Sequence, residues 1–588
     1  MPIARRSLLQ IPAAGAVTLL LGSRRAPPAS EAADWPQWAP TRADLYARIA
    51  ADAGAHGTDI RRFGARLDGR SDDSDAMERA LASGARVLLI PGSGTTVMRI
   101  TRQLRIAAPV TIVGMGERPT IRCEQRDRDL FRAYPESDDP ARFLTGVRFD
   151  NLHFDRPEGK RAHGKALRGY NLCDVSVTRC SARRMGLVGM HHARQRLGLY
   201  RRARGTIQED PAVLAGFSAT STDDLCEGLF VYDNDVDGES YMSQIARFEF
   251  TRRVAAAHNV GRFANISWWG GGGRRDEGGD PRHLRRVRDV YAADNVISHA
   301  NGGVYGNNGQ HIVVARNHVS MISDIGIDFE GCFDAVAYDN YVEHAGNYCF
   351  ATFFAAKNIL FRNNVGVQDG TGEKINERLG APGAGAVTGR ALFGMRSAGF
   401  GAVDGAITVK LIDNDFRWKG ETLFGVMRPS YFTSLELRGN RFENVECDLN
   451  YRRTTRVIAE NNLFTMNRAA DRPFRFISSN AAEIRIADNR IRSAVEQPAA
   501  SFAVLAQLSQ WSRAATISGN DIRSAGGTLP VVVRGEADPG VRMTLADNSG
   551  APIFAGTTAR ISASNNKDAS GRAVRPAPLP EEYILDRD

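Results

Sequence analysis

The sequence predicts an all-β solenoid, in which one chain winds into many short parallel strands that stack as coils. The first observation is a recurring phrase of two or three apolar residues, a short polar link, an asparagine and one more apolar residue. The second is its spacing, because Asn295, Asn317, Asn340 and Asn364 follow one another at 22, 23 and 24 residues. Periods of this length are typical of stacked repeat units.

The asparagine of this phrase is interpreted as a structural residue. An asparagine at one fixed turn position can hydrogen-bond the backbone of the neighbouring coil, where buried donors would otherwise lack partners. Each coil alone has strands too short to bury a face, so stacking creates the core. The series sets the register of the coils and consists of Asn151, Asn295, Asn317, Asn340, Asn364, Asn414, Asn440, Asn462, Asn489, Asn520, Asn548 and Asn566.

The segment Phe63 to Met77 reads FGARLDGRSDDSDAM, and it resembles the opening of the pectate-lyase-like superfamily. The resemblance implies a right-handed parallel β-helix with a short N-terminal capping helix. We expect that helix over residues 73–82, with Asp72 or Asp73 as its N-cap. Buried strands are expected over residues 87–92 and 110–114. Hydrolases, lyases and tailspikes share this opening, so it implies a fold and leaves the reaction open.

The expected organisation is an export signal and cleavage region (1–33), a lead-in (34–57), a right-handed parallel β-helix domain (58–567) and a C-terminal tail (568–588). Arg5-Arg6-Ser7-Leu8-Leu9 and the apolar run 11–21 resemble a twin-arginine signal. That run is shorter than the roughly 20 residues of a permanent membrane anchor. A bacterial periplasmic or secreted location is therefore expected, with the Tat translocase as a partner during export. The tail should lie along the surface or be mobile.

The net charge of +9 comes from arginines dispersed along the chain. These arginines are either plain solvated surface or a means of attracting an acidic ligand, because a positive field raises the local concentration of such ligands. On the second interpretation, the polysaccharide or oligosaccharide partner is anionic. No nucleic-acid-binding motif accompanies the charge, which argues against nucleic acid.

Seven cysteines at irregular spacing include no zinc signature. Most are expected to be small buried apolar residues, and the alternative is a bridge between Cys173 and Cys180 or between Cys332 and Cys349.

Insertions rich in Gly, Arg or Asp interrupt the pattern near 190–225, 268–286 and 366–400. In a solenoid such insertions become loops on one face, where they can wall a cleft.

The asparagine register stacks the coils 299–311, 322–334 and 345–357. It places Asn301 under Asp324, Tyr305 under Asp328 and Asn307 under Glu330, with Phe350 and Thr352 above the carboxylates. Strand alternation sends Ile325, Ile327 and Phe329 inward, so Asp324, Asp328 and Glu330 face outward together.

Clustered carboxylates are the residues that glycoside hydrolysis requires. A like charge nearby raises the pKa of at least one of them, so that it can donate a proton to the leaving oxygen. Side chains two apart on a strand begin roughly 6.5 to 7 Å from each other, the lower edge for inverting glycosidases. Asp328 and Glu330 are the first choice as acid/base pair, with Asp324 tuning or replacing one of them. The alternatives are a polar outer wall with incidental acids and a site where these acids ligate calcium.

One coil earlier, the register aligns Asn265 under Asn301 and Trp269 under Tyr305, with Trp268 in the core. Sugar rings stack on aromatic faces, so Trp269 and Tyr305 are predicted to bind substrate. The amides of Asn265, Asn301 and Asn307, the ring of Phe350, and the cations Arg274 and Arg316 complete the predicted substrate-binding set.

Two rival functions stay open. A polysaccharide lyase removes a proton beside a uronate carboxylate with Arg or Lys, which would make Arg274, Arg275, Arg316 and Lys357 important. A noncatalytic glycan-binding or polysaccharide-assembly protein would only grip the polymer. No cofactor is required, and calcium is the one metal considered, with Asp233, Asp235 and Asp237 as weak candidate ligands.

Overall fold

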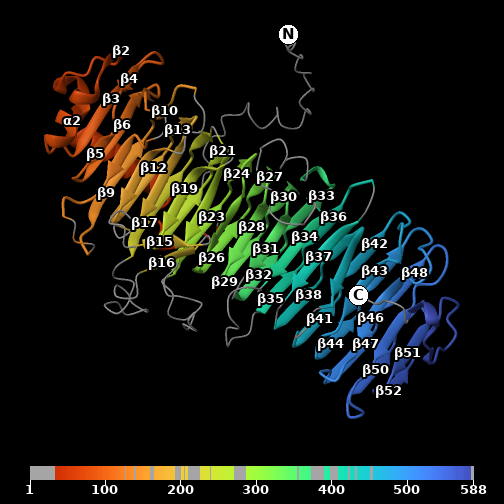
Figure 1. Ribbon diagram of the computed structural model, residues 1–588. Coiled ribbons are helices and arrows are strands. Elements are labelled where there is room, and N and C mark those ends of the chain that lie inside the picture. Colours follow the sequence, from red (N-terminus) through yellow and green to blue (C-terminus); the bar gives the residue numbers. More distant parts are fainter. Residues whose placement is uncertain are drawn as a thin grey trace, which may run out of the picture.

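One chain winds into three long parallel sheets that run the length of an elongated stack of coils. The computed structural model describes residues 33–583, apart from residues 126–127, 138, 140, 159–163, 193–199, 204–205, 210–224, 239, 241, 271–285, 354–355, 373–389, 397–407, 422–423, 431–432 and 451–453. The strands follow one another from the N-terminal end to the C-terminal end of the stack (Figure 1). The predicted leader 1–33 lies almost wholly outside the described residues.

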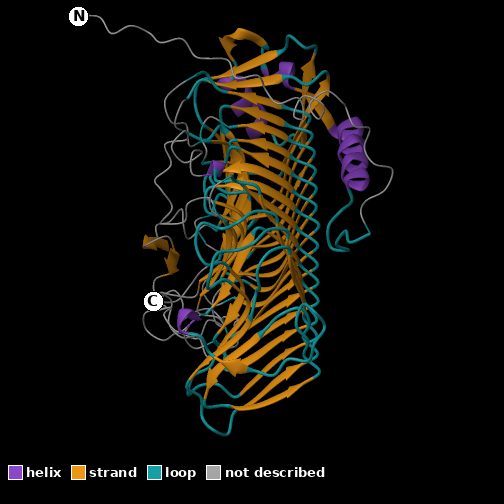
Figure 2. Ribbon diagram, turned by 90° about the vertical axis from the view of Figure 1, so that its right-hand side faces the viewer, coloured by secondary structure: helices purple, strands orange, loops and turns teal. Residues whose placement is uncertain are grey.

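The described strands fall into three long sheets that we name A, B and C, apart from the antiparallel pair β15 (Tyr200–Ala203) and β16 (Thr206–Glu209). Sheet A has 18 strands, from β1 (Gly57–Asp59) to β52 (Arg560–Ser564). Sheet B has 16, from β2 (Asp68–Asp72) to β48 (Asp521–Ser524). Sheet C runs from β5 (Leu104–Ile106) to β53 (Ala577–Pro578). Seen from the side, the strands form a continuous ladder (Figure 2).

Each coil contributes one strand to each sheet in turn, and the coil 287–307 is an example. Its strands are β23 (Val287–Ala293) in sheet A, β24 (Val296–Ser298) in sheet B and β25 (Val304–Asn307) in sheet C. Each pairs in parallel with its counterpart in the next coil. Parallel strands joined by crossovers are right-handed in almost all proteins, because twisted strands pack back on themselves in that sense. The predicted right-handed parallel β-helix is confirmed.

The asparagine series forms a buried ladder at the turn between sheets A and B. Asn317 donates from Nδ2 to the carbonyl of Ala292 at 3.0 Å and to Oδ1 of Asn340 at 2.9 Å. Its own Oδ1 accepts from the backbone N–H and Nδ2 of Asn295. The ladder asparagines are Asn234, Asn259, Asn295, Asn317, Asn340, Asn364, Asn414, Asn440, Asn462, Asn489, Asn520, Asn548 and Asn566.

Asn151 is the exception to the predicted series. It has a φ of 53° and donates to the carbonyl of Gly114, so it occupies the left-handed position that precedes the ladder residue. Leu152 fills the ladder position of that coil and is fully buried. In this coil the asparagine of the repeated phrase therefore lies one residue before the ladder position.

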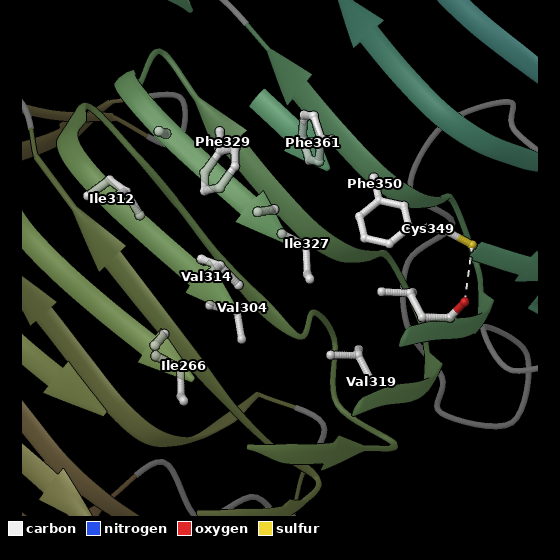
Figure 3. Close-up of a cluster of buried hydrophobic side chains, with 14 of the residues drawn as sticks. Ile266, Val304, Ile312, Val314, Val319, Ile327, Phe329, Cys349, Phe350 and Phe361 are labelled. Atoms are coloured by element: carbon white, nitrogen blue, oxygen red, sulfur yellow. Dashed lines mark hydrogen bonds between the residues drawn. The ribbon is translucent and has the colours of Figure 1, made fainter. Parts of the chain in front are cut away.

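A single apolar core fills the inside of the coils. Figure 3 shows Ile266, Val304 and Ile327, from three successive strands of sheet C, lining one side of it. Phe329 and Phe361 pack against each other with ring centroids 5.5 Å apart. The core continues through the stack because every coil exposes the same apolar face to its neighbours.

A short helix caps the N-terminal end, as the sequence predicted. Helix α2 spans Ser74–Ala82, and the Asp72 carboxylate accepts from the Ser74 backbone N–H at 3.0 Å. Asp73 instead accepts from the backbone N–H groups of Arg66 and Leu67. Strands β3 (Val87–Gly92) and β6 (Val110–Gly116) follow at the predicted places.

The lead-in packs on the outer face of sheet A. It contains helix α1 (Arg42–His56), whose apolar side covers alanines and tyrosines of successive coils. The ring centroid of Trp35 lies 5.4 Å from that of Tyr232 and 5.3 Å from that of Tyr291. The segment therefore ties several coils together from outside.

The C-terminal tail also lies along the surface. Strand β53 pairs with β51 (Ile553–Thr557), and the ring of Tyr583 stacks on Phe554 at 5.7 Å. No helix of the described part is long and apolar enough to cross a membrane. All seven thiols are free and six are buried in the packed interior, so neither candidate disulfide bridge is formed.

Candidate functional site

The predicted acidic residues lie on the outward face of sheet C. Strand β28 (Ile325–Glu330) pairs with β25, and the register places Asp328 beside Tyr305 and Glu330 beside Asn307. The backbone N–H of Asp324 donates to the carbonyl of Asn301 at 2.8 Å. These three predicted stacking relations are confirmed.

Alternation along β28 determines which side chains leave the core. Ile327 and Phe329 point inward, so Asp328 and Glu330 point outward. Ile325 departs from the prediction, because it packs in a separate apolar cluster with Tyr348. A Cβ on Gly326 would lie 2.3 Å from a methyl group of the core residue Val342, so the glycine takes the inward place.

The carboxyl group of Asp328 is buried although it faces outward. The side chain is 1% exposed, and burial is the largest cause that raises its pKa well above the usual value. The charges of Glu330 and Asp324 raise the pKa further, as does a hydrogen bond to Glu330. A neutral Asp328 is therefore favoured, and it can donate its proton to Glu330.

This hydrogen bond corrects the expected separation of the two carboxyl groups. The two carboxyl groups are within hydrogen-bonding reach of each other, so the side chains lean together and are closer than the roughly 6.5 to 7 Å inferred from strand geometry. The stereochemical argument for inversion, which depended on that spacing, has no support from this geometry.

Asp324 stands just before β28 and shares the same environment. Nδ2 of Asn347 donates to its Oδ1 at 3.1 Å, and burial raises the pKa of the carboxyl group. Its charge acts on Asp328 through space. Asp324 is therefore placed to tune the pair.

The aromatic residues meet as expected, although the register between their strands differs. In β22 (Ala264–Trp269), Ser267 pairs with Tyr305 and Trp269 pairs with Asn307. The shift is two residues, because Gly302 and Gly303 lengthen the turn before β25. The rings of Trp269 and Tyr305 still make an edge contact, with centroids 5.6 Å apart.

Several polar atoms on this face are buried and lack hydrogen-bond partners among the described residues. They are Oγ of Ser267, Oδ1 of Asn307 and Oδ1 of Asp328, from three successive strands. Buried polar groups are normally satisfied, so a row of unsatisfied ones calls for a missing partner. The hydroxyl groups of a sugar supply both donors and acceptors for such atoms.

Asn265 and Asn301 are connected as predicted. Nδ2 of Asn265 donates to Oδ1 of Asn301 at 2.9 Å, and the hydroxyl of Tyr305 donates to the same oxygen at 3.1 Å. Burial raises the pKa of Tyr305 to about 12. The phenol thus remains protonated and is held in place by Asn301.

Phe350 is not a substrate-binding residue by position. It pairs with Ile327 and points into the core beside Phe361 (Figure 3). Ala351 lies above Asp328, and Thr352 turns inward and donates to the carbonyl of Phe329 at 2.8 Å. The prediction was wrong because the register between these coils sets Phe350 one residue away from the acids.

Two of the predicted cations lie on the opposite side of the coil. Arg316 follows β26 (Gly309–Ala315) in sheet A, and it binds Asp34 and Asp294 at 3.0 Å each. It fixes the lead-in and does not face the acids. Lys357 begins β32 (Lys357–Arg362), also in sheet A, and is exposed. Arg274 and Arg275 lie outside the described residues.

The aspartates proposed as weak calcium ligands are spread over different faces. Asp233 binds Arg42 of α1 at 3.0 Å on the outside of sheet A. Asp235 and Asp237 belong to β18 (Asp235–Asp237) in sheet B. Within the described part of the chain, no three His, Cys, Asp or Glu side chains are grouped to hold a metal ion. Most of the predicted insertions lie outside the described residues.

Sequence reasoning missed a set of charged residues on earlier coils of sheet C. They are Lys165 on β11 (Lys165–Tyr170), His191 on β14 (Gly186–His191), and Arg247 and Glu249 on β19 (Ser243–Glu249). Asn234 and Asn259 carry the asparagine phrase. These two asparagines are 25 residues apart, whereas Arg247 pairs with Ser267, only 20 residues further on, so the asparagine register alone would have misplaced Arg247. Lys165 lies before the ladder begins.

Comparisons with known proteins give fold relatives at low identity. No family model matches the chain, and no curated protein does. The Dettilon tailspike protein is 11% identical over 70% of this chain and 66% of its own, with a TM-score of 0.34. The N-terminal fragment of bacteriophage Phi29 gene product 12 is 12% identical over 89% and 87% (TM-score 0.42). A family 28 exopolygalacturonase of Yersinia enterocolitica is 11% identical over 68% and 78% (TM-score 0.38). By the winding of its three parallel sheets, the chain is a right-handed parallel β-helix protein.

Proposed function

We propose that this chain is a polysaccharide-active enzyme that cleaves glycosidic bonds by hydrolysis. The observation that carries the proposal is the hydrogen-bonded pair of Asp328 and Glu330, buried on an outward face of the solenoid. A carboxylic acid kept neutral beside an ionised carboxylate is the arrangement that general acid and base catalysis requires.

In the proposed reaction, Asp328 gives its proton to the glycosidic oxygen as the bond from that oxygen to the anomeric carbon breaks. In this direct displacement the bound sugar and a water molecule separate the two carboxyl groups; the oxygen of that water bonds to the anomeric carbon, and Glu330 takes the proton that the water loses. Transfer of that proton through the hydrogen bond between the two carboxyl groups restores Asp328. The net change is the addition of one water across the bond.

The residues around the pair are suited to hold a sugar chain. Trp269 and Tyr305 present aromatic surface on the strands that precede the acids. Sugar rings carry apolar C–H faces that stack on such rings. The unsatisfied atoms of Ser267 and Asn307 lie beside them and can bond hydroxyl groups.

Replacing either acid by its amide tests the proposal. In Asp328→Asn and Glu330→Gln we expect turnover on a polysaccharide substrate to fall about 100-fold or more, because an acid or base is removed while shape is kept. Asp334→Asn is the matched control, since Asp334 is exposed on sheet A and should leave turnover unchanged. Full activity in both amide variants would remove these residues from the reaction.

We also propose that the protein is exported in bacteria as a folded unit by the Tat translocase, to the periplasm or beyond. The Arg5-Arg6 pair before a short apolar run supports this. Changing both arginines to lysine should leave the precursor in the cytoplasm, as measured by cell fractionation. Normal export of that variant would exclude the twin-arginine route.

A further inference from the structure

A second group of charged side chains is buried on the same face of sheet C, toward the N-terminal end. Lys165 is 5% exposed, and Glu249 and the nearby Asp129 are 1% and 3% exposed. Arg168 and Arg247 are partly buried beside them. Charged groups are rarely buried unless they are paired, so their partners decide what this cluster can do.

The two carboxylates of the cluster are already engaged. Asp129 binds Arg168 at 2.8 Å and accepts the backbone N–H of Lys165 at 3.0 Å. Glu249 binds Arg247 at 3.0 Å and lies 3.1 Å from Nδ1 of His191. Arg132, beside Arg168 on the preceding strand, also lies 3.5 Å from Asp129, so four cations including Lys165 share two carboxylates. Among the described residues, none forms a hydrogen bond or ion pair with Nζ of Lys165.

Glycine makes room for the lysine on the strand that follows. A Cβ on Gly189 would lie 2.9 Å from Cδ of Lys165 and 2.9 Å from Nε2 of His191. The lysine stem therefore lies over the backbone of Gly189, close to His191. The amine is held within the cluster, on the side of β14 and β19.

The cluster and the acid pair lie in one row of residues that are aligned on successive strands of sheet C. Along sheet C the register runs from Arg168 through Gly189, Arg247, Ser267 and Tyr305 to Asp328. Five strand spacings of about 4.8 Å separate the two ends, which is about 24 Å. The guanidinium carbon of Arg247 also lies 4.5 Å from the ring centroid of Trp269, so cationic and aromatic parts are continuous.

We propose that Lys165, Arg168 and Arg247 bind an anionic group, a carboxylate or a sulfate ester, of the saccharide that occupies the Asp328 and Glu330 site. The excess buried positive charge is then neutralised by the ligand. The identity of the ligand as a saccharide rests on the proposed function. Binding would place several sugar units between the anionic subsite and the acids.

The state of Lys165 makes anion binding dependent on pH. The pKa of Lys165 is lowered to about 7, first by burial and then by the charges of Arg168 and Arg247, against the opposing charges of Asp129 and Glu249. Burial also lowers the pKa of His191, which favours its neutral form. A bound anion raises the pKa of Lys165, so binding takes up a proton and weakens as pH rises from 6 to 8.

Titration calorimetry on the full chain tests this proposal. All measurements use the Asp328→Asn variant as the parent protein, so that the oligosaccharide probes are not cleaved. The probes are a galacturonic acid hexasaccharide, the same hexasaccharide with its carboxyl groups reduced, and a sulfated galactan hexasaccharide. We expect at least one acidic probe to bind about 10-fold or more tightly than the reduced one at pH 6, and more weakly at pH 8. Which acidic probe binds identifies the anionic group as carboxylate or sulfate.

Lys165→Met should lower the affinity for the acidic probe about 10-fold and abolish its pH dependence. The variant should fold, and its melting temperature should rise at pH 6, because a buried charge without a partner is removed. Arg492→Gln in sheet B is the control and should bind as the parent does. Equal affinity in Lys165→Met, equal affinity for the reduced probe, or no binding of either acidic probe would overturn the proposal.

The two proposals fail separately. If the anionic subsite is wrong, the acidic probe binds independently of Lys165 while the amide variants of the acid pair remain inactive. If the hydrolytic pair is wrong, those amide variants retain turnover while the effect of Lys165 on binding persists.

Discussion

Asp328 carries a carboxyl group whose surroundings favour the protonated form. In the unfolded chain an aspartate titrates near 3.9, whereas burial and the charge of Glu330 raise the pKa in the folded protein. Below the unfolded-state pKa this residue contributes its full stability, because the carboxyl group is neutral in both states. The contribution is lost as pH rises toward the raised pKa of the folded state, since folding must then bury an ionised group.

Asp328→Asn should therefore stabilise the fold at high pH. The amide resembles the neutral acid and cannot ionise, so we expect the melting temperature to exceed that of the parent by about 1 to 3 °C at pH 8. The gain should shrink toward pH 4. Asp334→Asn, at an exposed site, should show no such trend. A melting temperature of Asp328→Asn that is equal or lower at pH 8 would contradict the electrostatic account.

Residue positions could be predicted from the sequence where the coil length is constant. Tyr305 and Asp328 were correctly placed because alternation and the asparagine register suffice there. Trp269 was displaced because nothing in the phrase reports the two additional residues of the turn at Gly302 and Gly303. Hydrogen bonding between the acids depends on how the side chains lean, which strand periodicity does not encode.

The turn between sheets A and B is the element that the sequence describes best. Asn317 is buried and satisfies four polar groups of neighbouring coils. The insertions near 190–225, 268–286 and 366–400 left no comparable signal, because loop composition specifies neither direction nor contacts. The asparagine ladder thus defines the register of the coils, whereas the sequence does not predict the conformation of the inserted loops expected beside the site.

Asn317→Ala should destabilise the solenoid by about 2 to 4 kcal/mol, because it leaves several buried donors and acceptors without partners. Equilibrium unfolding in urea measures the change. The control is Gln310→Ala at a half-buried position of β26, the strand before this turn, which should cost less than about 0.5 kcal/mol. A similar loss in both variants would mean that the ladder contributes no more than an ordinary surface contact.

Across the whole molecule, one core and three sheets extend from the capping helix α2 to the C-terminal tail. The lead-in crosses sheet A on the outside and is held through Asp34, Trp35 and α1. The outward face of sheet C contains the buried acids, the aromatic residues and the cationic cluster in one row across successive strands. The molecule therefore separates a face that stabilises the coils from a face suited to a long polymer.

Analysis of the products from a panel of polysaccharides tests the central claim most directly. Reducing ends and the ultraviolet absorbance of unsaturated uronates are measured in the same digests, with and without a chelator. Hydrolysis by Asp328 and Glu330 predicts new reducing ends without that absorbance, no effect of the chelator, and about 100-fold or more less product from Asp328→Asn or Glu330→Gln. Unsaturated products that both amide variants still form would contradict it and would assign the chain to elimination chemistry instead.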